Sequence, residues 1–285
     1  MSTTEPASGQ QAQVPTCYRH PSRETYVRCT RCDRYICPEC MRSAAVGHQC
    51  VECVREGSKT VRGARTVFGG RVSSGRPVIT YTLIAINVVV FLLQSAGSVT
   101  EQRYALAPIA VADGHYERLV TAAFMHYGIA HLIFNMWALY VVGQPLEQWL
   151  GRLRFATLYG LSALGGSVLV YLFAAPNSLT EGASGAVFGL FGALFVVAKR
   201  LHYDVRGITV LIVLNLVITF VFPGISWQGH LGGLITGAAL GLAYAYAPQR
   251  SRTLVQVGAS LAAVVLFAVL IAVRTSQLTA QLGLS

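Results

Sequence analysis

Seven apolar segments in the last three quarters of this 285-residue chain constrain its fold most strongly. Each is near the roughly 20 apolar residues that a helix needs to cross a bilayer, although the fourth and fifth are shorter. The composition is 53% hydrophobic and only 12% charged, whereas a soluble domain carries nearer a quarter charged residues. The sequence therefore predicts an all-α polytopic membrane protein. The expected spans are residues 79–96, 126–142, 155–175, 184–198, 208–222, 231–247 and 254–273.

The region before the first span divides into three parts. Residues 1–16 form a Ser/Thr/Gln/Pro-rich tail that we expect to be disordered, and they lack the apolar stretch and cleavage pattern of a signal peptide. Residues 17–53 hold all seven cysteines and are expected to form a compact Cys/His module. Residues 54–77 are predicted to be a flexible basic linker, with Arg55, Lys59, Arg62, Arg65, Arg71 and Arg76 among glycines and serines.

The basic residues between the spans predict the orientation in the membrane. Counted from the first span, the third and fifth connections carry no Lys or Arg, while all three even-numbered connections do. Basic residues favour the cytoplasmic side, so we expect a cytoplasmic N-terminus and an external C-terminus in a multi-pass cell-membrane protein. The same rule explains the pI of about 9.5, and no nucleic-acid partner is expected. The even-numbered connections carry Arg152 and Arg154, then Lys199, Arg200 and Arg206, then Arg250 and Arg252.

Four polar residues fall at a similar depth in this topology. Ser184 begins the fourth span, His230 begins the sixth, and His131 and Asn135 lie one turn apart in the outer half of the second. All three spans start on the external side. The four side chains are therefore expected to converge near the outer face of the membrane.

These residue types suit nucleophilic catalysis. A serine hydroxyl needs a base within hydrogen-bond reach, and His230 is the only histidine on spans three to seven. No acid lies nearby on those helices, so the pattern favours a Ser–His dyad over a triad. Small residues let helix backbones approach closely, and Asn135, His131 and the Ser184 N–H are candidate oxyanion donors. The glycines recur as Gly185, Gly189 and Gly192 on span four and as Gly229, Gly233, Gly237 and Gly241 on span six.

Each residue also has a plainer interpretation. A serine in a glycine-rich membrane helix is usually a packing residue, and a lone membrane histidine is more often structural or part of a proton path. Asn135 alone could form an interhelical hydrogen bond. The matched depth of all four residues favours a catalytic site.

Several motifs together resemble the rhomboid family of intramembrane serine proteases. They are Gly182-Ala183-Ser184-Gly185, Gly229-His230 with its following glycines, His131-Leu132-Ile133-Phe134-Asn135, and Gly143-x-x-x-Glu147-x-x-x-Gly151. The resemblance covers roughly residues 80–247. It implies a six-helix core at residues 78–250, a Ser184–His230 dyad, an oxyanion site with His131 and Asn135, and a structural or water-holding His126. Residues 251–285 resemble the arrangement in which one transmembrane helix is added after the core.

The chain departs from the family pattern at two positions. Many relatives have a tyrosine four residues after the serine, stacked under the histidine, where this chain has Phe188. Phenylalanine keeps the ring, so stacking on His230 is expected to persist. The first loop of the family usually carries Trp-Arg, and this chain has Glu117-Arg118.

The N-terminal module contains four pairs of metal ligands at x2 spacing, which is enough for two tetrahedral zinc ions. Disulfides are a weaker explanation because cytoplasmic thiols stay reduced. The order resembles B-box or RING-like cross-brace fingers, in which pairs one and three share one zinc ion and pairs two and four share the other. This resemblance assigns Cys17, His20, Cys37 and Cys40 to one ion and Cys29, Cys32, Cys50 and Cys53 to the other, with His48 as a spare.

The leading functional hypothesis is an intramembrane serine endopeptidase that cleaves transmembrane protein substrates in the bilayer. It needs no cofactor for catalysis, and its zinc module would recruit a cytoplasmic protein partner or regulate the enzyme. An alternative is a catalytically silent rhomboid-like adaptor that binds transmembrane clients. A transporter or channel would predict inverted repeats and paired charges within the spans, and only Glu147 lies near a span end.

Overall fold

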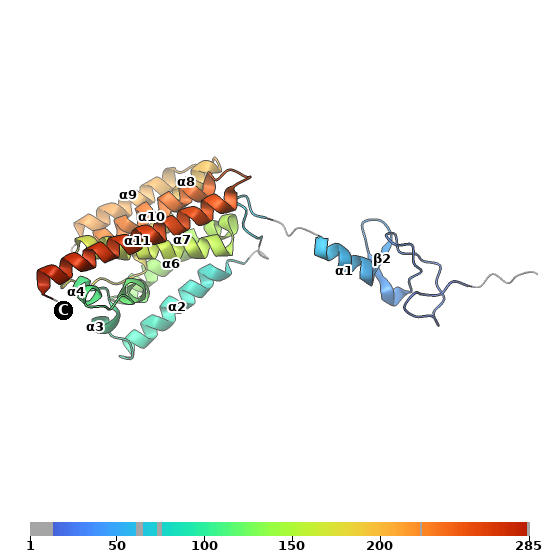
Figure 1. The fold of residues 1–285 in the computed structure, drawn as a ribbon, viewed down its shortest axis with the longest axis horizontal. Coiled ribbons are helices and arrows are strands. Elements are labelled where there is room, and N and C mark those ends of the chain that lie inside the picture. The colour runs from blue at the N-terminus through green and yellow to red at the C-terminus, as the bar shows by residue number, and fades with distance from the viewer. Residues whose placement is uncertain (1–13, 61–64, 73–75, 223, 284–285) are drawn as a thin grey trace, which may run out of the picture. The chain divides into compact units, whose positions relative to one another are not determined.

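The computed structural model describes residues 14–60, 65–72, 76–222 and 224–283 (Figure 1). Most of the predicted tail at residues 1–16 and Arg62 of the predicted linker lie outside the described residues. The chain divides into two compact units, Met1–Gly63 and Ala64–Ser285, and each is described by itself.

The first unit is built around cysteines. A short 3-10 helix, η1 (Pro38–Cys40), leads into an antiparallel hairpin of β1 (Met41–Ser43) and β2 (His48–Cys50). Among its described residues, the buried hydrophobic core consists of Ile36 and six cysteines. A core of this kind is too small to stabilise a fold by apolar burial alone.

Helix α1 (Val51–Thr60) follows the hairpin directly. It takes up residues 54–60, which the sequence assigned to a flexible linker. Glu52 in its first turn and Lys59 in its last turn both interact favourably with the helix dipole, and each interaction stabilises the helix by about 0.3–1 kcal/mol.

Every predicted span in the second unit is a helix. Four of these helices, α2, α6, α7 and α11, are long and apolar enough to cross a membrane, and α9 is a shorter apolar helix. The bounds are α2 (Val78–Ser95), α6 (Ile129–Leu150), α7 (Arg152–Phe173), α8 (Ser184–Arg200), α9 (Arg206–Val221), α10 (Trp227–Ala245) and α11 (Arg252–Leu282). The long first loop contains α3 (Glu101–Tyr104), α4 (Pro108–Ala112), α5 (Arg118–Thr121) and η2 (Ala122–Phe124).

Helix α10 lies among α7, α8, α9 and α11 and packs most extensively against α8 (Figure 1). Glycines allow this contact. A Cβ atom at Gly233 would lie 1.8 Å from the Gly185 carbonyl oxygen, and one at Gly237 would lie 1.9 Å from that of Gly189. Both distances are far below van der Waals contact, so the two backbones meet directly, as the glycine spacing predicts.

Helix α6 extends eight residues beyond the predicted end, to Leu150, and contains Glu147. This buried carboxylate accepts hydrogen bonds from the backbone N–H groups of Ile79 and Thr80, at 3.0 and 2.8 Å, and from the Thr80 hydroxyl. The first amides of a helix have no partner within it, so Glu147 caps α2. Gly143, one turn earlier, leaves room for Thr80, since a Cβ there would lie 2.9 Å from the threonine methyl group. Gly143 and Glu147 of the motif thus join α6 to α2, whereas Gly151, just after α6, lies against Gly70 of the loop before α2.

The loop at residues 65–71 also packs on the helices. Phe68 is 3% exposed and belongs to the main hydrophobic core. Its carbonyl oxygen accepts a hydrogen bond of 3.2 Å from Gln256 of α11. This part of the predicted linker therefore belongs to the helical unit.

Candidate active site

Ser184 is the first residue of α8 and follows a loop of fixed conformation. The Gly182 N–H donates to the Ala122 carbonyl at 2.9 Å, and Thr180 forms a β-bridge with Leu106. Gly182 has a φ of +134°, which side-chain-bearing residues rarely adopt. A glycine is therefore required at position 182, two residues before Ser184, by the turn that precedes α8.

His230 lies in the first turn of α10, which begins at Trp227, slightly earlier than predicted. The Ser226 hydroxyl accepts the Gly229 N–H at 3.2 Å and caps this helix. The imidazole is 9% exposed and stacks on Phe188, with ring centroids 4.0 Å apart and planes 15° apart. The predicted stacking of Phe188 under His230 is present without a tyrosine hydroxyl.

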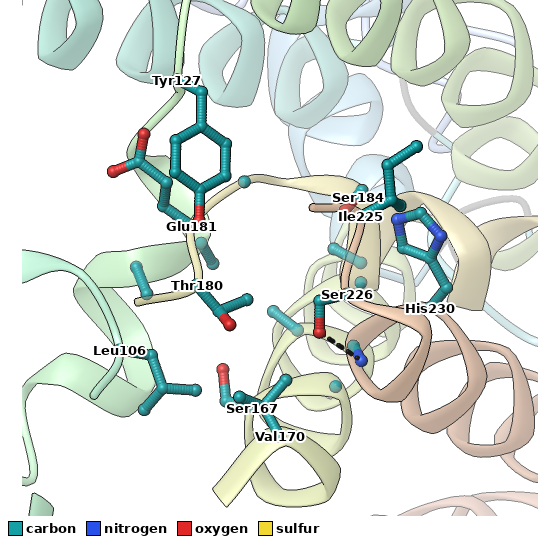
Figure 2. Close-up of a pocket in the computed structure, with 18 of the residues that line it drawn as sticks. Leu106, Tyr127, Ser167, Val170, Thr180, Glu181, Ser184, Ile225, Ser226 and His230 are labelled. Carbon is teal, nitrogen blue, oxygen red and sulfur yellow. Dashed lines mark hydrogen bonds between the residues drawn. The ribbon is translucent and has the colours of Figure 1, made fainter. Parts of the chain in front are cut away.

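Ser184 and His230 share two cavities, one of about 280 Å³ and one of about 320 Å³. Figure 2 shows the first, with Ser184 and His230 on one side and Tyr127, Thr180 and Glu181 on the other. Among the hydrogen bonds of the described residues, none joins Ser184 to His230. Catalytic hydrogen bonds in ligand-free enzymes are often long and shorten only when substrate binds.

The predicted oxyanion residues lie beside the serine. A Cβ at Gly182 would be 2.6 Å from His131 Cε1 and 3.6 Å from Ser184 Oγ, so the absence of a side chain at Gly182 makes room for the imidazole. Asn135 is buried, and its Nδ2 donates to the His131 carbonyl at 3.0 Å. Asn135, His131, Ser184 and His230 all line the larger cavity.

His126 precedes α6 and is 1% exposed. Its ring lies 5.1 Å from that of His131, and neither of its ring nitrogens has a hydrogen-bond partner among the described residues. The sequence predicts a structural or water-holding role for His126. Buried polar groups are normally paired, so the unpaired nitrogens favour the water-holding alternative. Its backbone N–H donates to Gln94 Oε1 at 3.1 Å, which links it to α2.

Two residues that the sequence analysis did not single out belong to this region. Thr219 of α9 is 3% exposed, and its hydroxyl lies 2.6 Å from His230 Nδ1. Glu181 is 4% exposed, lines the smaller cavity, and accepts a weak hydrogen bond of 3.4 Å from Gln94. Its Oε2 atom has no hydrogen-bond partner among the described residues. Burial raises the pKa of this carboxyl to about 7, with a further contribution from Glu101. Thr219 had no sequence signal, whereas an acid within three residues of a candidate nucleophile could have drawn attention to Glu181.

The N-terminal unit brings together the same two groups of four ligands that the cross-brace order predicts. In each group, one potential ligand atom per residue lies within 4.8 Å of all the others. His48 belongs to neither group. The groups are Cys17, His20, Cys37 and Cys40, and Cys29, Cys32, Cys50 and Cys53.

The ligand separations fit tetrahedral zinc. Zn–S bonds of about 2.3 Å place two sulfurs of one tetrahedron about 3.8 Å apart, and a sulfur and a histidine nitrogen about 3.6 Å apart. Cys32 Sγ and Cys50 Sγ are 3.8 Å apart. His20 Nδ1 lies 3.9, 3.2 and 3.5 Å from the sulfurs of Cys17, Cys37 and Cys40. The residues present could therefore hold two metal ions.

Comparison with known proteins covers the helical unit. The Rhomboid domain family matches residues 113–247, which include Ser184, His230, His131 and Asn135. The chain is 33% identical over 173 residues to the putative rhomboid protease YdcA of Bacillus subtilis, covering 58% of this chain and 86% of that protein. The chain belongs to the rhomboid family.

Two further relatives are longer proteins. The chain is 39% identical over 184 residues to the rhomboid protease GluP of Bacillus subtilis, covering 59% of this chain and 36% of that protein. It is 37% identical over 139 residues to the mitochondrial RHOMBOID-like protein 6 of Arabidopsis thaliana, covering 46% and 45%. The chain thus spans less than half the length of these two relatives. It is a multi-pass membrane protein of a family that includes intramembrane proteases.

Proposed function

We propose that the protein is an intramembrane serine endopeptidase that cleaves transmembrane protein substrates. The observation that carries the proposal is the placement of Ser184 and His230 at the starts of α8 and α10, two helices whose backbones touch through glycines, with both side chains lining the same cavities. Small residues along this contact let the two helices approach closely, which brings their first turns together.

The chemistry assigns a role to each residue. Ser184 Oγ attacks the scissile carbonyl while His230 accepts its proton, and His230 then donates that proton to the leaving amine. The oxyanion is stabilised by the Ser184 N–H at the helix start, by Asn135 Nδ2 and by His131. Water then hydrolyses the acyl-enzyme by the same steps. No metal takes part, and the ligand clusters of the other unit contain none of these residues.

The N-terminal clusters are proposed to bind two structural zinc ions. The argument rests on the ligand separations and on backbone N–H groups that donate to sulfur, from Cys50 to Cys29 at 3.2 Å and from Cys53 to Cys50 at 3.3 Å. Such bonds favour thiolates, which are the metal-binding form of cysteine. The distribution of basic residues favours a cytoplasmic position for this unit, where it would meet a protein partner, and an active site toward the external face.

The decisive experiment measures cleavage of a transmembrane reporter and labelling by a fluorophosphonate probe, using the purified full chain in detergent. Ser184→Ala should abolish both cleavage and labelling, and His230→Ala should abolish cleavage. The double variant should lose no more cleavage activity than either single variant, because the pair acts as a unit. Ser95→Ala is the matched control, since this exposed hydroxyl at the end of α2 donates to the Phe91 carbonyl and has no other hydrogen bond among the described residues. Wild-type cleavage by Ser184→Ala would contradict the proposal, and a chain that is folded but never labelled would instead be the silent adaptor.

A further inference from the structure

The proposed base makes one contact that a two-residue dyad does not require. His230 Nδ1 lies 2.6 Å from the hydroxyl oxygen of Thr219, which comes from a different helix. Thr219 is 3% exposed and is the only buried residue in the described helix α9. A short bond to the candidate base thus forms at the one point where α9 is fully covered.

The Thr219 hydroxyl has a second partner. Its Oγ1 donates to the Asn215 carbonyl one turn earlier, at 2.7 Å. Such back-bonding is common for threonine in helices and carries no function by itself. Thr209, on the same helix, donates to the Val205 carbonyl in the same way, and among the described residues it has no hydrogen bond to a histidine. The bond to the imidazole is what distinguishes Thr219.

Proton accounting then fixes the state of the histidine. A threonine hydroxyl has one hydrogen and two acceptor lone pairs. Because the Asn215 carbonyl is only an acceptor, it takes that hydrogen, and the contact with Nδ1 requires that Nδ1 carry a proton and donate it to Thr219. A neutral imidazole has one N–H, so Nε2 is left as the free acceptor. Nε2 is the remaining ring nitrogen able to take a proton from Ser184.

We propose that Thr219 is a positioning residue that holds His230 in the Nδ1–H tautomer, so that Nε2 faces Ser184 as a base. This inference rests on the proposed function. The bond also orients the ring against Phe188, and it persists when the imidazole gains its second proton, because Nδ1 remains a donor. Thr219 does for this dyad what the acid does in a serine-protease triad, with a neutral acceptor.

The test compares Thr219→Val, which removes the acceptor at similar volume, with Thr219→Ser, which keeps it, and with Thr209→Val as the matched control. In the reporter assay, Thr219→Val should lower kcat about ten- to a hundredfold, a part of the roughly 10²–10⁴-fold that a positioned base supplies, and leave KM within about twofold. Thr219→Ser should restore most of the loss. Thr209→Val should match the wild type.

A second measurement does not depend on activity. Nitrogen NMR of the full chain labelled at its histidines, with the His230 signals assigned from a His230→Gln sample, reports the tautomer directly. The Ser184→Ala chain should show His230 as Nδ1–H, and adding Thr219→Val should produce a mixture with Nε2–H. An Nε2–H imidazole in the Thr219-containing chain would overturn the inference, as would equal activities of Thr219→Val and Thr219→Ser. If Ser184→Ala is inactive while Thr219→Val retains wild-type kcat, only this inference fails and the protease proposal stands.

Discussion

Gly237→Ala tests whether the contact between α8 and α10 positions the active site. A Cβ at this position would lie 1.9 Å from the Gly189 carbonyl oxygen and 2.4 Å from its Cα. Ordinary carbon–oxygen contacts are about 3.3 Å, so the helices must separate by more than an ångström. Overpacking of this kind typically costs about 1–3 kcal/mol. A misplacement of about 1 Å between reacting groups can cost about a hundredfold in rate.

The expected result is a lower unfolding temperature and a fluorophosphonate labelling rate reduced about tenfold or more, measured well below the unfolding transition. Gly160→Ala is the control, because a Cβ at that helical glycine of α7 meets no atom within 4 Å. It should label at the wild-type rate and be as stable or slightly more stable, since alanine favours helix. Wild-type stability and labelling of Gly237→Ala would refute the idea that direct backbone contact between the helices positions the dyad.

Three further predictions concern separate parts of the molecule. Asn135→Ala should lower kcat roughly ten- to a thousandfold with little change in KM, because an oxyanion donor acts mainly in the transition state; a change confined to KM would assign Asn135 to substrate contact. Burial raises the pKa of Glu181 to about 7, so the folded state favours its neutral form, and stability is lost as pH rises from about 4.5 to 7. Glu181→Gln should therefore raise the unfolding temperature relative to the wild type at pH 8 and not at pH 4. An equal change in unfolding temperature at both pH values would contradict the raised pKa of Glu181. Metal analysis of the full chain should find two zinc ions, and chelation should unfold the N-terminal unit without slowing reporter cleavage.

The helices and their closest contact could be predicted because both depend on local patterns. Apolar runs in the sequence mark all seven helices, although only four of them are long and apolar enough to cross a membrane by that measure. Glycines four residues apart on α10 predict its contact with α8. The resemblance of the ligand order to cross-brace fingers likewise implied the two Cys/His groups that the structure brings together. Each of these signals repeats within a short stretch of sequence.

The contacts that the sequence did not reveal join residues far apart in the chain. Glu147 caps a helix whose first residues lie 68 and 67 positions away, and Glu181 pairs with Gln94 across 87 positions. Neither contact produces a periodic pattern in the sequence. In the sequence, Glu147 stood out as part of a motif that resembles the rhomboid family and as a charge near a span end, but neither signal named its partner. Its role as a cap became clear once the unpaired amides of α2 were placed beside it.

Thr219 shows the same limit at the active site. Threonine is compatible with a membrane helix when its hydroxyl bonds to the preceding turn, so its presence on α9 carries no signal. Its proposed role depends on the contact between its hydroxyl oxygen and His230 Nδ1 of α10, which the sequence of α9 does not reveal. His230, the proposed base, is therefore held by contacts of two kinds. Backbone contact between α10 and α8 through glycines positions the imidazole, and Phe188 of α8 covers one face of the ring. In our proposal, Thr219 of α9 determines which ring nitrogen carries the proton.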